Sequence, residues 1–458
     1  MSGSLRRQPN AAAGDKGDKG YKVILAARLV DGVSRTVALD PALIIENGRI
    51  VKLATRVDWR EVAGSLGHDV NDYQVHDYPG GTILPGLIDG HVHLSFSALA
   101  TSPEVLAEYH DSDDVRLIAM SIENGHRCLA GGVTTVRDCG GPGTLIQSLR
   151  DAVTAGVTRG PRIVASGMPI TTTGGHCHFF GLRADNEAEI VKAVRQLVED
   201  DVDVVKVMAT GGRMTRNSNI FEPQYTVEEM TALVSEANRL ERKVASHALS
   251  IEGIRNSVEA GVDTIEHCNW QDEQGVWDFD EQLLKQLAEQ GTHVSVTLVG
   301  YMRDAYSAWL EDPEGAPLTP LLKRRFELEA EMFNRGLNAF ISSDAGVPGS
   351  HFAELHRSAA VAVGWLGLEP HVAIEALTSR AAKAIGIFDD VGSVEVGKLA
   401  DIIVVAGDPV SDIEALGALE ATYVAGERVV LGGAVLPTDP RKIGPRPATS
   451  RRSGGRYP

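Results

Sequence analysis

Lys206 stands in the middle of the apolar run from Val204 to Met208, and Gly211-Gly212 follows that run closely. A short, β-branched run that ends near a glycine turn is typical of a strand buried on both faces. Burial of an unpaired ammonium group is costly, so a lysine in such a run is usually paired, neutralised or used in chemistry. A paired or snorkelling lysine is the ordinary explanation for an arbitrary chain. The residues at the ends of the other apolar runs favour chemistry here.

Four histidines and one aspartate stand at or near the ends of these other runs: His91, His93, His247, His267 and Asp344. His91 and His93 are two residues apart, so on a strand both side chains point to the same side and could hold one cation. Imidazole and carboxylate groups suit zinc and similar divalent ions. A single His-x-His is a weak signal, but together with Lys206 these residues predict a metal site.

The elements that must position these side chains are strands alternating with helices. Strands are predicted at residues 88–93, 133–138, 162–166, 204–208, 243–247, 264–267, 293–297 and 339–343. Eight strands over roughly 260 residues have the size and rhythm of a (β/α)8 TIM barrel, in which functional residues project from the carboxyl ends of the strands. Asn186 with Glu189, and Thr226 with Glu229, are typical helix starts in two of the gaps. The alternative is a doubly wound open sheet, which would be expected to carry a glycine-rich phosphate loop where His-x-His stands.

Shorter strands are predicted near both ends of the chain, at 21–27, 42–46 and 49–54, and again at 402–406, 421–425 and 427–431. The first set includes an Asn47-Gly48 hairpin turn. We therefore expect a small β-sandwich domain built from residues 21–87 and 395–440, with the barrel at 88–394. Residues 1–20 are rich in glycine, alanine and charge and are expected to be disordered, and 441–458 to form a mobile basic tail.

Composition places the chain among soluble globular proteins. It has 458 residues, 43% of them hydrophobic, and a net charge of -18, which disfavours nucleic acid and anionic membranes as partners. No apolar stretch approaches the ~20 residues that span a bilayer, and residues 1–20 show no secretory signal. The four cysteines, Cys128, Cys139, Cys177 and Cys268, are few for this length and fit reduced thiols in a cytoplasm. We expect a cytoplasmic protein that acts on a small molecule.

Several motifs together resemble the amidohydrolase superfamily. They are the stretch from Leu84 to His93, Gly132 to Asp138, Lys206, His247, Ile265-Glu266-His267, Ser343-Asp344-Ala345 and Gly397 to Asp401. The resemblance extends from residue 21 to about residue 433, and the combination is highly specific.

The resemblance implies two divalent metal ions, with Zn2+ as the first expectation and Co2+, Mn2+ or Fe2+ as alternatives. His91, His93 and Asp344 would bind one ion, and His247 and His267 the other. Lys206 would be carboxylated by CO2 to a carbamate that bridges both, since a desolvated neutral amine is a nucleophile. Asp344 would shuttle the proton of a water activated between the two metals to the leaving nitrogen. A homo-oligomer is also expected by resemblance.

Two loop motifs narrow the branch of the superfamily. Gly174-Gly175-His176-Cys177-His178 and Tyr225 look like the branch that holds Xaa-Pro dipeptidase-like and imidazolonepropionase-like enzymes, ochratoxin amidase, and phenylurea and molinate hydrolases. In such enzymes the histidine and the tyrosine contact substrate, so catalytic and substrate-binding roles are expected of His176 and Tyr225. His178, Arg213 and His351 are further candidate substrate contacts. The Cys177-His178 continuation departs from the commoner Gly-Gly-His-Gly, which leaves the substrate class open.

The expected function is hydrolysis of a C–N bond in an amide, a dipeptide or an N-acyl amino acid. The alternatives are a phenylurea or thiocarbamate hydrolase and a cyclic amide hydrolase of the imidazolone type. The intact His91 disfavours the herbicide-cleaving members, in which the first histidine of His-x-His is altered. Lys206 disfavours a deaminase with one metal, and retention of all the predicted ligands disfavours a non-catalytic scaffold.

Overall fold

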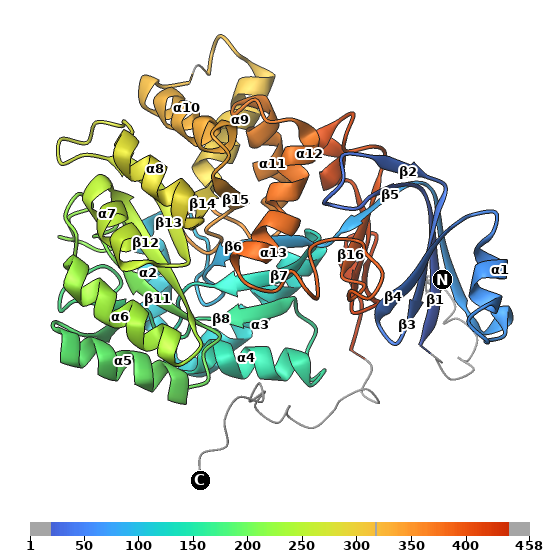
Figure 1. Cartoon of the computed structure of the whole chain (residues 1–458), viewed down its shortest axis with the longest axis horizontal. Coiled ribbons are helices and arrows are strands. Elements are labelled where there is room, and N and C mark those ends of the chain that lie inside the picture. Colours follow the sequence, from blue (N-terminus) through green and yellow to red (C-terminus); the bar gives the residue numbers. More distant parts are fainter. Residues whose placement is uncertain (1–19, 317, 439–458) are drawn as a thin grey trace, which may run out of the picture.

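The strand predicted around Lys206 is present as β11 (Val204–Met208), and all its residues are buried. The computed structural model describes residues 20–316 and 318–438. Residues 1–19, which make up nearly all of the predicted disordered segment, and the predicted tail at 441–458 lie outside the described residues. In the described parts, the chain forms a large α/β region and a smaller β region beside it (Figure 1).

The α/β region contains a strand at each of the eight predicted places. They are β6 (Leu87–Val92), β7 (Val133–Asp138), β8 (Arg162–Ala165), β11, β12 (Lys243–Ser250), β13 (Thr264–Gln271), β14 (His293–Thr297) and β15 (Asn338–Ser342). They pair in parallel in two ladders, β6-β7-β8 and β11-β12-β13-β14-β15. A parallel bridge between Val92 and Ala345 connects the two ladders at β6, and Asp203 N donates to Ala165 O at 2.8 Å where β8 meets β11. Two short strands, β9 (Ile170–Thr171) and β10 (Leu182–Arg183), extend the second ladder.

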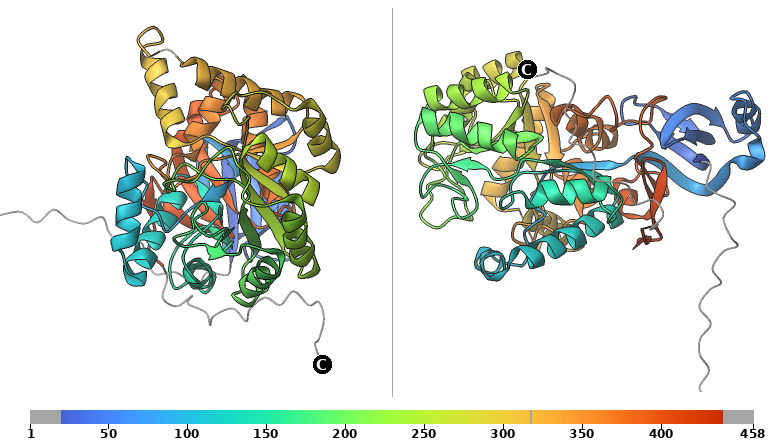
Figure 2. Two further views of the ribbon diagram at one scale, coloured as in Figure 1. Left: turned by 90° about the vertical axis from the view of Figure 1, so that its left-hand side faces the viewer. Right: turned by 90° about the horizontal axis from the view of Figure 1, so that it is seen from below.

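Helices surround these strands on the outside (Figure 2). They are α2 (Ser102–Asp111), α3 (Asp114–Ala130), α4 (Leu145–Thr154), α5 (Glu187–Glu199), α6 (Val227–Arg239), α7 (Ile251–Ala260), α8 (Glu281–Gln290), α9 (Gly300–Glu311), α10 (Pro320–Asn334), α11 (Leu355–Gly364), α12 (Pro370–Ala376) and α13 (Ser379–Ala384). Both predicted helix starts are confirmed: Asn186 accepts from Glu189 N, and Thr226 forms a capping box with Glu229. None of the described helices is long and apolar enough to cross a membrane.

Strands from both ends of the chain form one sheet in the smaller region. Its members are β1 (Tyr21–Val30), β2 (Val37–Leu39), β3 (Pro41–Glu46), β4 (Arg49–Thr55), β5 (Gln74–Pro85), β16 (Ile402–Ala406), β17 (Leu419–Val424), β18 (Glu427–Leu431) and β19 (Ala434–Val435). β5 connects the two ends, because it pairs in parallel with β1 on one side and antiparallel with β16 on the other. Leu43 from β3 and Val404 from β16 belong to one buried apolar cluster, so the two halves of the sheet share a core. A short helix, α1 (Trp59–Gly64), packs against β3 and β4.

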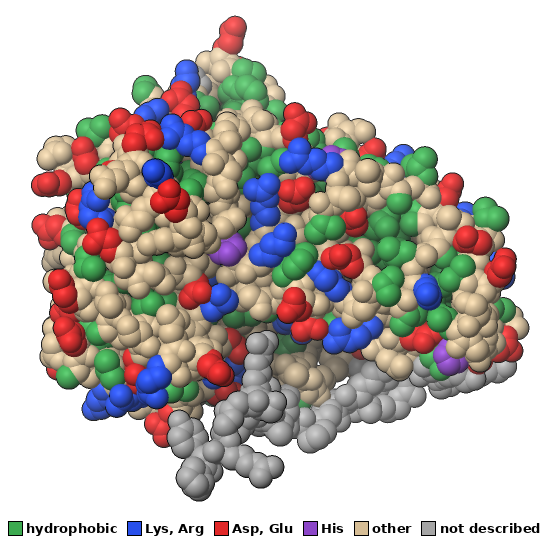
Figure 3. All heavy atoms as spheres, viewed as in Figure 1, with side chains coloured by type: hydrophobic (Ala, Val, Ile, Leu, Met, Phe, Trp, Pro, Cys, Tyr) green, Lys and Arg blue, Asp and Glu red, His purple; other side chains and the backbone are tan. Residues whose placement is uncertain are grey.

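On the face shown in Figure 3, acidic and basic side chains are interspersed over both regions. The parallel strands β11 to β15 all present their carboxyl ends at the same edge of their ladder. That edge is where the predicted metal ligands lie.

Candidate metal centre

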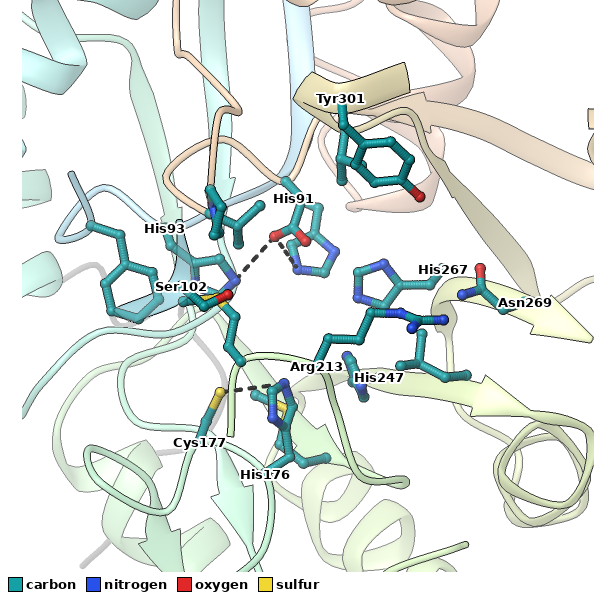
Figure 4. A pocket seen from close by; sticks show the side chains of 18 of the residues that line it. His91, His93, Ser102, His176, Cys177, Arg213, His247, His267, Asn269 and Tyr301 are labelled. Carbon is teal, nitrogen blue, oxygen red and sulfur yellow. Dashed lines mark hydrogen bonds and ion pairs between the residues drawn. The ribbon is translucent and has the colours of Figure 1, made fainter. Parts of the chain in front are cut away.

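The structure brings all six predicted metal ligands to one pocket. His91 lies in β6, and His93 is the first residue after the end of β6. Lys206, His247 and His267 lie in β11, β12 and β13, and Asp344 comes two residues after β15. Each is at most 9% exposed, and all six line the pocket whose histidines are shown in Figure 4.

The side chains converge closely enough to share ligands. Asp344 Oδ1 lies 3.5 Å from His91 Nε2 and 3.4 Å from His93 Nε2. The ring centroid of His267 is 4.9 Å from that of His91 and 4.7 Å from that of His247. One possible ligand atom from each of His91, His267 and Asp344 lies within 4.8 Å of the others, which is the spacing expected around a metal ion.

Lys206 is completely buried, and its Nζ has no hydrogen-bond partner among the described residues. Buried polar side chains nearly always have partners, so this amine calls for a ligand or a chemical modification. The cluster around it offers four imidazoles and one carboxylate, a donor set that suits zinc and similar divalent ions. These residues therefore fit a metal centre, and the orphaned amine fits a lysine that is used there.

Electrostatics leave most of these imidazoles neutral. Burial is the main cause that lowers the pKa of His91 to about 4, and it lowers the pKa values of His247 and His267 well below the usual range. Burial opposes ionisation of Asp344, but the neighbouring His91 and His93 outweigh it and lower the pKa of that carboxyl to about 2. Neutral imidazole and ionised carboxylate are the forms that bind metal ions.

A buried salt bridge lies behind His91. Glu266 Oε2 lies 3.0 Å from His91 Nδ1, and Glu266 Oε1 accepts from Arg137 Nη2 at 2.5 Å. Arg137 also donates to Thr264 Oγ1 at 2.9 Å and to Gly90 O at 2.7 Å. A proton held on Nδ1 by the carboxylate leaves the Nε2 lone pair of His91 for the cluster, as is common for metal-binding histidines. Both charged residues stand inside apolar strands, which was a signal visible in the sequence, but they were not predicted as functional.

His176 reaches the same pocket from the loop after β9. Its ring centroid lies 4.7 Å from that of His247, its Nδ1 lies 3.0 Å from Thr215 Oγ1, and its Nε2 lies 3.5 Å from Cys177 Sγ. A Cβ atom added to Gly212 would stand 2.3 Å from His176 Nε2, so only glycine permits this approach. Arg213, the next residue, is exposed and also lines the pocket (Figure 4).

The other predicted substrate contacts are not among the residues that line the pocket. The hydroxyl of Tyr225 donates to Ala184 O at 2.9 Å. His178 Nδ1 lies 2.8 Å from Gly175 O, and His351 is exposed. The structure therefore brings His176 and Arg213 to the metal ligands but leaves Tyr225, His178 and His351 outside the pocket.

The pocket has a volume of about 260 Å³ and contains residues that sequence reasoning missed. One part of its wall is apolar, with Phe96, Met208, Met214 and Leu249 among its members. The polar part includes Ser102, Asn269, Tyr301 and Arg325. The sequence offers little signal for Tyr301 and Arg325, because they lie on two helices between β14 and β15, far along the chain from every motif.

The fold and the site define a class of protein, namely α/β proteins with a cluster of candidate metal ligands at the carboxyl ends of parallel strands. The chain matches the model of the amidohydrolase family over residues 82–429. Ochratoxinase from Aspergillus niger is 26% identical over 451 residues, which cover 90% of this chain and 87% of that protein. Imidazolonepropionase from Shewanella halifaxensis is 26% identical over 402 residues, covering 80% and 86%. The crystal structure of a Xaa-Pro dipeptidase with bound methionine in the active site has a TM-score of 0.74 at 26% identity, covering 89% of this chain and 99% of that one.

The chain belongs to the amidohydrolase family, because the family model matches well over half of it. The resemblance found in the sequence motifs is thereby confirmed. It also follows that the chain is a member of a hydrolase family whose enzymes act on small molecules.

Proposed function

We propose that the chain is a binuclear metal-dependent hydrolase that cleaves a C–N bond in an N-acyl amino acid or a dipeptide, on a (β/α)8 barrel. One observation carries this proposal: the buried Lys206 Nζ has no hydrogen-bond partner among the described residues and faces a pocket lined by five histidines and an aspartate. A structural lysine would be paired, and a centre for one metal would not need it.

Each ligand would serve one of two ions. His91, His93 and Asp344 would hold the first, His247 and His267 the second, and a carbamate formed from Lys206 and CO2 would bridge them. His247 Nε2 lies 3.1 Å from Gly211 O, so a proton there leaves Nδ1 as the ligand atom. Two divalent ions bound in this way supply an acidified water and a Lewis acid for the scissile carbonyl.

The chain's own groups then move the proton and hold the substrate. The carboxylate of Asp344, ionised because its pKa is about 2, accepts a proton from the attacking water and passes it to the leaving nitrogen. Burial is the main cause that lowers the pKa of His176 to about 3, so its ring is neutral and contributes a hydrogen bond rather than a charge. His176 orients the scissile carbonyl, and the exposed Arg213 contacts the substrate at the pocket mouth.

Relatives at 26% identity support the choice of substrate class. The Xaa-Pro dipeptidase noted above holds methionine, and a prolidase was solved in complex with N-methylphosphonate-L-proline. One ligand is an amino acid and the other an amino-acid derivative, and both carry a carboxylate. The structures of molinate hydrolase and phenylurea hydrolase B match at 23% and 20% identity, which supports the fold alone.

The test is a hydrolysis screen of metal-reconstituted protein against dipeptides, N-acyl amino acids, phenylureas and imidazolones. We expect turnover of the first two groups and about two divalent ions per chain by elemental analysis. Asp344→Asn keeps the shape and one oxygen but removes the base, so kcat should fall on the order of 10²–10⁴-fold while metal content falls far less. Turnover confined to phenylureas, or an Asp344→Asn enzyme within a few-fold of wild type, would contradict the proposal.

A further inference from the structure

A buried arginine, Arg325, forms part of the pocket wall and makes no ion pair with the candidate metal ligands among the described residues. Arg325 lies on α10, is 8% exposed and lines the pocket together with Tyr301 of α9. We propose that Arg325 and the Tyr301 hydroxyl bind a carboxylate of the substrate, and thus select acids over their neutral amides. This inference rests on the proposed hydrolase function and adds the residues that set its specificity.

The hydrogen bonds of Arg325 hold its guanidinium in place without using all its donors. Nε donates to Glu329 Oε1 at 2.7 Å, Nη2 to Thr297 O at 3.0 Å, and Nη1 to Tyr301 Oη at 3.3 Å. A guanidinium has five N–H groups, so one on each terminal nitrogen has no partner in the described parts of the chain. Two N–H groups on adjacent terminal nitrogens form the fork that matches a carboxylate.

Arg325 is also close enough to the metal ligands for one small substrate to reach both. It lines the same pocket of about 260 Å³ as His267. A substrate anchored at Arg325 by a carboxylate would therefore place its neighbouring amide near the cluster.

The remaining wall suggests what lies between the two ends. Met208, Met214, Leu249 and Val299 line the pocket, and such side chains favour an apolar group. The substrate class is therefore an N-acyl or N-aminoacyl derivative of an apolar amino acid with a free α-carboxylate.

Arg325 suits this role better than Arg213, the other arginine of the pocket. Arg213 is exposed, and ordering a long exposed side chain on a carboxylate costs conformational entropy. Arg325 is already held by three hydrogen bonds, and a charged pair is stronger where water is excluded.

The test compares N-acetyl-L-methionine with N-acetyl-L-methioninamide, which share the scissile bond and differ only in the carboxylate. In the wild type kcat/KM for the acid should exceed that for the amide. The double variant Arg325→Met/Glu329→Gln removes the cation without leaving a buried carboxylate unpaired. It should lower the acid-to-amide ratio roughly 10- to 100-fold, mainly through KM for the acid, as loss of a charged hydrogen bond does. Tyr301→Phe, at a residue 53% exposed, should lower the ratio roughly 2- to 10-fold.

Two further variants and a binding measurement separate the possible failures. Arg324→Gln removes the neighbouring cation on the same helix, which does not line the pocket, and should leave the ratio unchanged. Arg213→Gln is the competing arm: if it, rather than the Arg325 variant, abolishes the ratio, the assignment is overturned. Equal losses for acid and amide in the Arg325 and Tyr301 variants would show a purely structural role and also overturn it.

Calorimetry with L-methionine and L-methioninamide tests the same contact without turnover. Wild-type protein should bind the acid more tightly, and the double variant should not. If the wild type hydrolyses no C–N bond but keeps this binding preference, the proposed reaction fails and the carboxylate site stands. If hydrolysis occurs and neither ratio nor binding depends on the carboxylate, the site fails and the reaction stands.

Discussion

Lys206→Met should change the stability of the protein in opposite directions with and without metal ions. Methionine keeps the unbranched apolar stem and removes the amine. In the metal-free wild type that amine is fully buried and has no hydrogen-bond partner among the described residues. Its removal should therefore relieve a cost, whereas in the metal-loaded protein it should remove a ligand.

The magnitude follows from this burial. A buried donor without a partner costs about 1–3 kcal/mol, and a charged one costs more. The metal-free variant should thus be more stable than metal-free wild type by about 1–3 kcal/mol. Metal binding stabilises the wild type by about 2.7 kcal/mol for each ion present at 100 times its dissociation constant. Because the variant loses at least one ion, the wild type should be the more stable protein once metal and bicarbonate are present.

The assay is urea unfolding of both proteins, each stripped with a chelator or reconstituted with Zn2+ and bicarbonate. The transition midpoints report the difference as long as the m values agree. Elemental analysis gives the ions per chain, and mass spectrometry under native conditions tests for the added CO2 on Lys206. Lys192→Met is a matched control, because Lys192 is exposed on α5. This substitution should change neither the stability of the protein in either state nor its metal content.

A Lys206→Met protein that is less stable than wild type in both states would refute the reasoning, because the amine would then have a structural partner. Retention of two ions by the variant would refute the ligand role separately. If the stability difference between variant and wild type is the same with and without metal, and the metal content is unchanged, Lys206 is an ordinary buried residue.

Two other substitutions test the surroundings of the cluster. Glu266→Gln weakens the hydrogen bond to His91 Nδ1 and leaves the charge of Arg137 unpaired. The metal affinity measured by chelator competition should therefore fall about 10- to 100-fold. An unchanged affinity would mean that packing alone orients His91. Tyr225→Phe removes the hydrogen bond to Ala184 O and should cost about 1–3 kcal/mol of stability while kcat/KM changes less than about 3-fold. A much larger kinetic loss, with stability preserved, would return Tyr225 to the catalytic set that the sequence motif predicts.

The metal ligands and the strands of the α/β region could be predicted from the sequence for a physical reason. A buried strand is a continuous apolar run, so a polar residue inside it or at its end, such as Lys206 or His247, stands out. Tyr225 and His351 lie in loops, where no periodicity says which way a side chain points. Arg325 is one of two adjacent arginines on an amphipathic helix, and only the packing of α10 over the end of β14 distinguishes it from Arg324.

The pairing of the smaller sheet shows the same limit. Six of its nine described strands lie close to predicted positions, but β2, β5 and β19 were not predicted. The position of β5 between β1 and β16, where Thr82 and Ile83 pair with both neighbours, was not predictable. Long-range pairing of this kind leaves no local pattern in the sequence.

The aim of the ligands depends on backbone conformations that residue types alone do not reveal. His267 and Cys268 have φ values of 67° and 48°, and the β12–β13 ladder shifts register between Ala248 and Ser250. Positive φ costs a non-glycine residue on the order of 1–3 kcal/mol, and irregularities of this kind re-aim side chains beside active sites. The alternation rule for a regular strand therefore stops applying at His267.

A positive φ, here 52°, also orients the side chain of Asp344, and contacts from β6 hold the turn in which it lies. Asp89 accepts from both the backbone N and the hydroxyl of Ser343, the residue just before Asp344. The same strand carries His91 two residues later, so one element sets both the imidazole and the turn that brings the carboxylate to it. The buried carboxyl of Asp89 in β6 thus holds the strained turn at Asp344. Loss of Asp89 should therefore displace Asp344, although the two residues are far apart in the sequence. This coupling gives Asp89, which does not line the pocket, a role within the motif from Leu84 to His93.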